Sequence, residues 1–260
     1  LFLLQSWWPG FEPLSFNYPA WSISIEYYTY LLFAVILWWL PRQARALFAV
    51  IAVLAMVLLT VDSVLLTTQA LQGLSCFFAG AVTYQLYHAL RDVRLSQRLG
   101  LLLEVGVLSV IVLLLGMVNT PPKAVMALLF CLAVLVFAFE AGSCSTLLGR
   151  RPFRRLGKLS YSIYLTHATL LVLSYLVLKA LGNMAGIVLL ADLPETDSGV
   201  LKRYIATGSL LLNNALLVGQ LLGVLMVSTL TYRYVELPAI AAGKHWLKRD
   251  AALAPATTAP

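Results

Sequence analysis

The chain has 260 residues, of which 61% are hydrophobic and 11% are charged, and its formal net charge is +7. Soluble domains carry about a quarter charged residues, so this composition excludes a soluble globular protein and predicts an integral membrane protein. The basic residues fall mostly in the short loops between apolar stretches, where membrane topology accounts for them, and this argues against nucleic acid as a partner.

Apolar stretches long enough to cross a bilayer recur along the chain. A spanning helix needs about 20 residues for a hydrocarbon core of about 30 Å, and this criterion predicts an all-α, multi-pass transmembrane bundle with about seven spans. The stretches cover residues 22–40, 47–66, 69–89, 99–118, 124–142, 160–182 and 206–233. We expect residues 1–238 to form one membrane domain and residues 239–260 to form a disordered tail.

The loops between these stretches alternate in charge. Lys and Arg concentrate in every second loop, which the positive-inside rule assigns to the cytoplasm together with the C-terminal tail. These basic segments are Arg42–Arg45, Arg91–Arg98, Arg150–Lys158 and Lys244–Arg249. The intervening loops, including the acidic segment from Asp192 through Glu195 to Asp197, are then expected to face outward.

The first predicted span opens with the sequence Trp21-Ser22-Ile23-Ser24-Ile25-Glu26. A carboxylate within an apolar stretch is costly, so Glu26 is a functional candidate. Ser22, Glu26 and Tyr30 follow one another at intervals of four residues and therefore line one helical face. The alternative is that Glu26 lies at the membrane boundary and extends to water. Glu104 and Glu140, near the ends of other stretches, are interpreted only in this second way.

A second polar stripe opens the sixth predicted span, in the segment Leu156–His167. Ser160, Tyr164 and His167 fall at positions i, i+4 and i+7 of a helix, on one face. Histidine there is suited to act as a base or as a hydrogen-bonding anchor. The alternative is a structural histidine whose hydrogen bonds are satisfied within the bundle.

Arginines gather just before this stripe, at Arg150, Arg151, Arg154 and Arg155. Guanidinium groups suit phosphate, so the segment is a candidate for gripping an acyl-CoA. Topology and anionic lipid headgroups explain the same residues without any such role. No Cys or His residues stand at metal-ligand spacing and the three Cys form no disulfide framework, so no metal and no bound cofactor is predicted.

Three motifs, in the same order, resemble those of the membrane-bound acyltransferase 3 family. Trp21–Glu26 resembles its W-S-L-S-x-E signature, Leu156–His167 resembles L-G-x-x-S-Y-x-x-Y-L-x-H, and Tyr232–Pro238 resembles its closing aromatic, Glu, x, Pro pattern. The resemblance implies a multi-pass enzyme of a bacterial inner membrane. Such an enzyme moves an acyl group, commonly acetyl in an O-acetylation, from acyl-CoA to a hydroxyl of a cell-surface glycan, a lipid-linked sugar or a similar acceptor.

The family resemblance and the two polar stripes together predict the residues of the site. We expect Glu26 and His167 to be catalytic. The expected substrate-binding residues are Trp21, Ser22, Ser24, Tyr30, Ser160, Tyr161 and Tyr164, and the four arginines are expected to bind the acyl-CoA. The family's catalytic histidine on its first span has no counterpart here, so we expect the N-terminal spans to be missing and the site in this chain to be incomplete.

Two other functions fit the same composition. One is a transporter or flippase of a lipid-linked sugar or acyl group, although the chain lacks the matched broken helices that transporters often show. The other is a non-catalytic scaffold whose polar stripes bind neighbouring helices.

Overall fold

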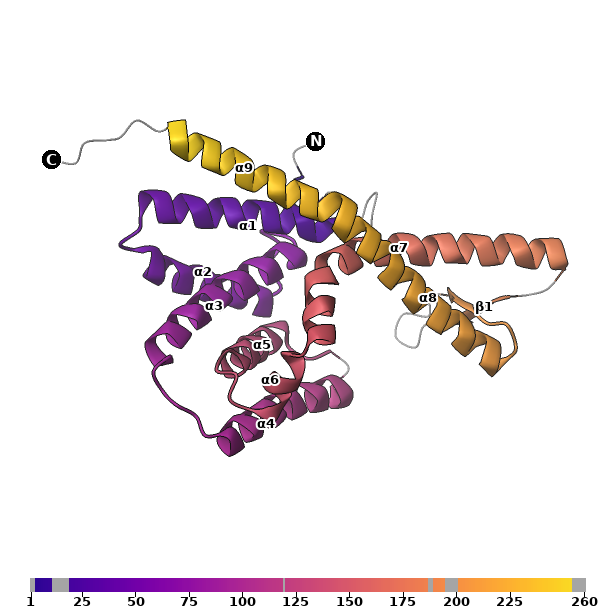
Figure 1. Cartoon of the computed structure of the whole chain (residues 1–260), viewed down its shortest axis with the longest axis horizontal. Coiled ribbons are helices and arrows are strands. Elements are labelled where there is room, and N and C mark those ends of the chain that lie inside the picture. Colours follow the sequence, from indigo (N-terminus) through magenta and orange to yellow (C-terminus); the bar gives the residue numbers. More distant parts are fainter. Residues whose placement is uncertain (1–2, 11–18, 119, 187–188, 195–200, 254–260) are drawn as a thin grey trace. The chain divides into compact units, whose positions relative to one another are not determined.

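The computed structural model describes residues 3–10, 19–118, 120–186, 189–194 and 201–253. Figure 1 follows the elements along the chain. The bounds are α1 Ala20–Trp39, α2 Ala44–Thr60, α3 Thr68–Leu90, α4 Gln97–Met117, α5 Lys123–Ala138, α6 Ser143–Leu148, α7 Arg151–Ala185, β1 Leu190–Pro194, β2 Leu201–Ile205, α8 Leu210–Thr231, the π-helix η1 Tyr232–Glu236 and α9 Leu237–Leu253. The chain forms two compact units, Leu1–Arg155 (unit 1) and Leu156–Pro260 (unit 2), and each is described by itself.

Each apolar stretch predicted from the sequence contains a helix, but the expected number of spans is not confirmed. Within the described residues, four helical segments are long and apolar enough to cross a membrane. They are Ala20–Trp39, Gln97–Met117, Arg151–Ala185 and Leu210–His245. Helices α2 and α5 are apolar but have only 17 and 16 residues, and α3 carries several polar side chains.

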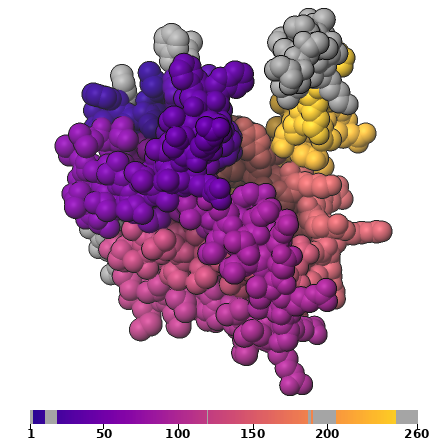
Figure 2. Space-filling model, turned by 90° about the vertical axis from the view of Figure 1, so that its left-hand side faces the viewer, coloured from indigo at the N-terminus to yellow at the C-terminus, as the bar shows by residue number. Residues whose placement is uncertain are grey.

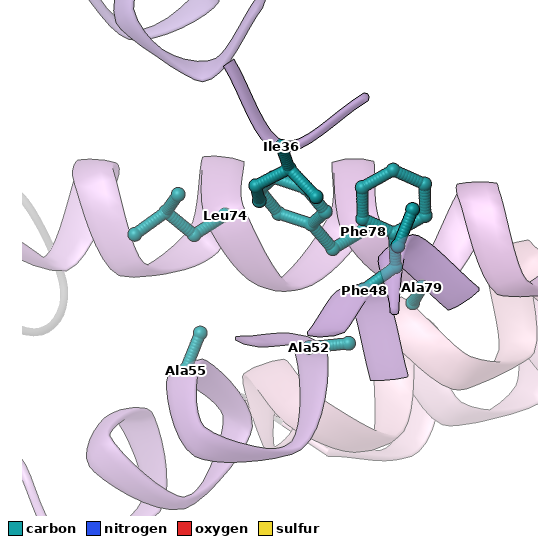
Figure 3. Close-up of a cluster of buried hydrophobic side chains, with 8 residues drawn as sticks. Ile36, Phe48, Ala52, Ala55, Leu74, Phe78 and Ala79 are labelled. Atoms are coloured by element: carbon teal, nitrogen blue, oxygen red, sulfur yellow. The ribbon is translucent and has the colours of Figure 1, made fainter. Parts of the chain in front are cut away.

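Unit 1 has its main core where α2 packs against α3, with α1 beside them (Figure 1). The buried face of α2 recurs at helical spacing, and most of its members are alanines. Small side chains allow neighbouring helices in a membrane to approach closely, which lets dispersion contacts hold them together. The cluster, shown in Figure 3, consists of Ile36, Ala44, Phe48, Ala52, Ala55, Leu74, Phe78 and Ala79.

Aromatic rings fill the space that the alanines leave. Phe78 is fully buried, and its ring lies 5.4 Å from that of Phe48, centroid to centroid. Phe33 of α1 stacks on Phe48 at 4.9 Å, so the rings join all three helices. Figure 2 shows one face of unit 1, on which the indigo and purple residues of α1, α2 and α3 form a continuous packed surface.

A second, smaller cluster joins α4 and α5 through Val107, Ile111 and Met126. The outward side chains of α4 are also apolar, and Leu102 is 70% exposed and Val112 66% exposed. So large an exposed apolar surface marks contact with lipid or with further helices, in agreement with a membrane protein.

Unit 2 consists of α7 from Leu156 onward, a β-hairpin and the rod formed by α8, η1 and α9, which runs continuously in Figure 1. Strands β1 and β2 pair antiparallel from Leu190 opposite Ile205 to Pro194 opposite Leu201. The hairpin is an addition to the predicted all-α fold, and it lies in the loop expected to face outward. Glu195 and Asp197 of that loop lie outside the described residues.

The C-terminal segment differs from the sequence prediction. We expected residues 239–260 to be a disordered tail, but α9 continues the helix through Leu253. The segment after Pro238 is rich in Ala, Leu, Lys and Arg, all strong helix formers, and it follows a helix that is already nucleated. Residues 254–260 lie outside the described residues.

Helices α1 and α3 are in close contact at Gly73. A Cβ added there would overlap the Ile25 side chain of α1, whereas one added at Gly80 of the same helix would meet nothing within 4 Å. We expect Gly73→Ala to lower the free energy of unfolding by about 1–3 kcal/mol through overpacking. Gly80→Ala should be neutral or stabilising by up to about 1 kcal/mol. Unfolding of both variants in detergent would measure the difference, and equal stability would contradict the close approach.

Candidate functional site

The WSISIE segment borders a cavity of about 530 Å³ in unit 1. Helices α1, α3 and α5 line this cavity, and most of the lining is apolar. Its charged side chains are Glu26 of α1 and Lys123 at the start of α5, and Gln72 of α3 adds an amide. A mainly apolar cavity of this size with a few convergent polar groups is the usual form of a small-molecule site. We refer to it as the Glu26 cavity.

Three of the predicted residues of α1 meet in this cavity, namely Trp21, Ser22 and Glu26. Ser22 and Glu26, four residues apart, share one helical face as predicted, and Trp21 lines the cavity beside them. Tyr30, one turn further, is not part of the lining. Its ring packs on Phe77 of α3 with centroids 5.4 Å apart, so the polar stripe ends at Glu26.

Ser24 faces a different environment. It is fully buried, its hydroxyl donates to the carbonyl of Leu3, and its own carbonyl accepts a 3.1 Å hydrogen bond from the Trp7 indole. Ser24 therefore lies outside the lining of the Glu26 cavity and holds the N-terminal segment on α1 instead.

The same N-terminal segment also reaches α3. Thr67 is the N-cap residue of α3, and its hydroxyl accepts a 3.1 Å hydrogen bond from the Ala70 amide while donating to the Ser6 carbonyl. The Thr67 amide donates to the carbonyl of Trp7 at 3.4 Å. Residues Leu3–Trp7 thus connect the start of α1 with the start of α3, the two helices that provide most of the cavity wall.

In unit 2, the second and third motifs contact each other. The Ser162 hydroxyl on α7 donates to the Glu236 carboxylate on η1 at 2.7 Å. Ser162 is buried, whereas Ser160 is exposed and donates only to the Gly157 carbonyl of its own helix, at 2.8 Å. Ser160 was the predicted residue of this face and Ser162 was not, although both belong to the Ser-Tyr-Ser motif.

Further polar pairs join α7 to α8. The hydroxyls of Thr166 and Ser228 lie 3.0 Å apart, and Ser174 donates to the Gln220 side chain at 2.5 Å. Hydrogen bonds of this kind join transmembrane helices where apolar surface gives no preference over lipid. With the Ser162 to Glu236 bond, they hold the two helices in one register.

The third motif forms the π-helix η1. The Leu237 amide donates to the Tyr232 carbonyl five residues before it, which widens the turn. Pro238 follows and has no amide hydrogen to donate within the helix. Single π turns inside helices are frequent at functional sites, and here the turn places Glu236 against Ser162.

His167 has one ring nitrogen engaged and one available. Its Nδ1 lies 2.6 Å from the Tyr164 carbonyl and 3.2 Å from the Ile163 carbonyl. Because carbonyl oxygens only accept, Nδ1 carries the hydrogen, and neutral His167 then has its lone pair on Nε2. This tautomer suits the predicted role of a base. Tyr164 flanks the ring at 5.8 Å between centroids, and Tyr161 is 45% exposed.

Glu104 is the functional candidate that sequence analysis missed. It was interpreted as a boundary residue reaching water, but it is 1% exposed. Its carboxylate accepts from the amides of Gly142 at 3.0 Å, Cys144 at 3.0 Å and Ser145 at 3.3 Å, and from the Ser145 hydroxyl. The interpretation was wrong because the partners come from a segment almost forty residues away, which no local pattern identifies.

The predicted arginines lie directly after this contact. Arg150, Arg151, Arg154 and Arg155 are all exposed, and the last three share one face of the first turns of α7. They are the groups best suited to a phosphate-bearing substrate. Within the described ranges, no three His, Cys, Asp or Glu side chains gather as a metal site would require.

The predicted residues thus fall into separate groups. Unit 1 holds the Glu26 cavity and the arginines, and unit 2 holds the stripe of Ser160, Tyr164 and His167. Glu26 and His167 belong to different units, so each is described only with its own neighbours.

Comparison with known families gives one match. A model of the acyltransferase 3 family, described as an acyltransferase domain, matches residues 1–233. The match takes in the first two motifs and ends within the third. No protein of curated function and no solved structure gives a significant match.

The contact between Ser162 and Glu236 generates a second prediction. Ser162→Ala should lower the free energy of unfolding by about 1–2 kcal/mol, because it leaves a partly buried carboxylate without its donor. Ser160→Ala is the matched control two residues away, and its change should stay within about 0.5 kcal/mol. Thermal unfolding of the two variants in detergent would compare them. A Ser162→Ala protein as stable as the Ser160→Ala protein would exclude a stabilising bond between the motifs.

Proposed function

Since the chain belongs to the acyltransferase 3 family, we propose that it transfers an acyl group, in the first instance acetyl, from acyl-CoA to a hydroxyl of a cell-surface glycan or lipid-linked sugar. The transfer takes place in a bacterial inner membrane, with the C-terminus on the cytoplasmic side. Membership of the family makes the protein a membrane acyltransferase, and the donor, the acceptor and the orientation are the proposal.

The observation that carries the proposal is the Glu26 cavity. It combines the Glu26 carboxylate with the Gln72 amide, the Lys123 ammonium group and the aromatic face of Trp21, in mainly apolar surroundings. Hydrogen bonds are stronger in such surroundings than in water, so the carboxylate can hold an acceptor hydroxyl firmly. Trp21 offers an apolar face with a polar edge, which suits the similarly mixed surface of a sugar.

The donor requirements are met elsewhere in the chain. The exposed arginines lie just before α7 and in its first turns, in the basic segment that the positive-inside rule assigns to the cytoplasm, where acyl-CoA is found. Guanidinium groups bind phosphate in a bidentate manner, which fits the phosphates of the donor. Acyl-CoA therefore approaches from the cytoplasmic side and the acceptor from the Glu26 cavity.

The chemistry needs a proton acceptor. The acceptor oxygen attacks the thioester carbonyl carbon, a C–O bond forms and the C–S bond breaks. The hydroxyl proton passes to a base, and the CoA thiolate leaves and takes up a proton. His167, with its lone pair on Nε2, has the form that a base requires, and the Glu26 carboxylate can accept the hydrogen bond of a hydroxyl; the two residues belong to different units, and each is a candidate within its own unit. Direct transfer and transfer through an acylated side chain both balance in this way.

Replacing the cavity carboxylate tests this function. Membranes that contain the native-length protein are supplied with acetyl-CoA labelled in the acetyl group, and base-labile label in the glycan is measured. Glu26→Gln should reduce label incorporation by about 100-fold, because a neutral amide oxygen accepts the hydrogen of the hydroxyl less strongly than a carboxylate does. Glu140→Gln, an exposed residue outside the cavity, should leave it unchanged.

Each result has a distinct meaning. Unchanged transfer in a folded Glu26→Gln protein would remove Glu26 from the site while leaving the acyltransferase assignment intact. If the wild-type protein itself transfers no label from acetyl-CoA, the proposed donor or acceptor is wrong.

A further inference from the structure

The buried carboxylate of Glu104 holds the start of α6 against α4. Glu104 lies on α4, a helix long and apolar enough to span a membrane. Its partners are the amides of Gly142, Cys144 and Ser145 and the Ser145 hydroxyl, and Gly142 is the N-cap residue of α6. The carboxylate therefore takes the place that an N-cap side chain would usually have.

This arrangement is costly unless the partners stay in place. An uncompensated charge in such surroundings costs several kcal/mol, whereas the amides at a helix start stabilise a negative charge. The backbone is also held very close. A Cβ at Gly142 would overlap the Glu104 carboxylate, and a Cβ at Gly100 would lie 2.7 Å from the Ala141 carbonyl carbon. Residues 141–145 are thus tied to α4 both by hydrogen bonds and by close packing.

The arginines follow residues 141–145 closely along the chain. Helix α6 has six residues, Gly149 ends it, and Arg150 stands just before α7. Six residues of helix span about 9 Å, so the direction of α6 sets where the arginines begin relative to α4. They also lie at the N-terminal end of a helix, where the helix dipole disfavours positive charge. An anion bound there would relieve that repulsion.

We propose that Glu104 is a positioning residue for the acyl donor. Through α6 it holds Arg150, Arg151, Arg154 and Arg155 in the arrangement that binds the phosphate groups of acyl-CoA. The inference rests on the proposed function and adds to it a residue that touches neither substrate.

A rigid anchor distinguishes this role from general attraction to lipid. Anionic headgroups are mobile and adapt to any cluster of exposed arginines, so they need no fixed backbone. Bidentate binding of a phosphate requires guanidinium planes at set positions, and it weakens when the supporting backbone shifts. Lipid headgroups and acyl-CoA both present phosphate groups, and they differ in whether binding depends on Glu104.

The first arm of the test measures kinetics and binding with the native-length protein. Glu104→Gln should raise the KM for acetyl-CoA and weaken binding of CoA by about tenfold each, with kcat and the acceptor KM unchanged. The milder variant Ser145→Ala removes only the hydroxyl contact and should shift both in the same direction by less. Glu140→Gln is the control and should behave as wild type.

The second arm asks whether Glu104 acts through the arginines. In a protein in which Arg150, Arg151, Arg154 and Arg155 are all replaced by Ala, adding Glu104→Gln should weaken CoA binding no further, because the groups it positions are gone. Binding to phosphatidylglycerol vesicles should be equal for wild type and Glu104→Gln.

Several results would overturn the inference. The first is unchanged CoA binding in folded Glu104→Gln and Ser145→Ala proteins. The second is a fall in kcat together with a rise in both KM values, in proportion to the loss of thermal stability. The third is weaker vesicle binding with unchanged CoA binding. If Glu104→Gln weakens CoA binding as expected but the wild-type protein transfers no label, the result would instead contradict the proposed function and leave this inference standing.

Discussion

The bond between the Glu104 carboxylate and the start of α6 determines the arrangement of the later part of unit 1. Glu104 joins α4 to α6, and α6 leads directly to the arginines and α7. A buried carboxylate tolerates few alternatives, because any displacement of α6 leaves a charge without donors in an apolar environment. The net contribution of this contact to stability is modest, whereas breaking it costs much more free energy. This penalty therefore keeps the chain in one arrangement.

The two units solve the same packing problem by different means. Inside a bilayer, apolar side chains gain little by leaving lipid, so helices need another reason to choose one neighbour. Unit 1 uses small residues that allow close approach, as where Gly73 meets Ile25 and where alanines of α2 face α3. Unit 2 uses hydrogen bonds across α7 and α8, as between Thr166 and Ser228. Both devices specify register, which uniform apolar faces cannot do.

Within the first two motifs, residues two positions apart have different roles, because one faces the candidate site or solvent and the other makes a structural contact. In the first motif, Ser22 and Glu26 face the cavity while Ser24 holds the N-terminal segment. In the second motif, Ser160 remains exposed while Ser162 binds Glu236 of the third motif. A motif of this kind is recognisable in sequence because several of its positions are constrained for separate reasons. Chemistry accounts for only some of them.

The sequence by itself determined the membrane class, the family, the approximate helix positions and the helical face shared by Ser22 and Glu26. Apolar length, helical spacing and charged loops are local properties, so one chain suffices to identify them. The expected seven spans are not confirmed, because α2 and α5 are apolar but short and α3 carries polar side chains. Only the tertiary structure decided that Glu104 is buried, that Ser162 rather than Ser160 contacts Glu236, and that Ser24 lies outside the Glu26 cavity. Each of these depends on partners distant along the chain, and sequence periodicity carries no information about which segment supplies the donor.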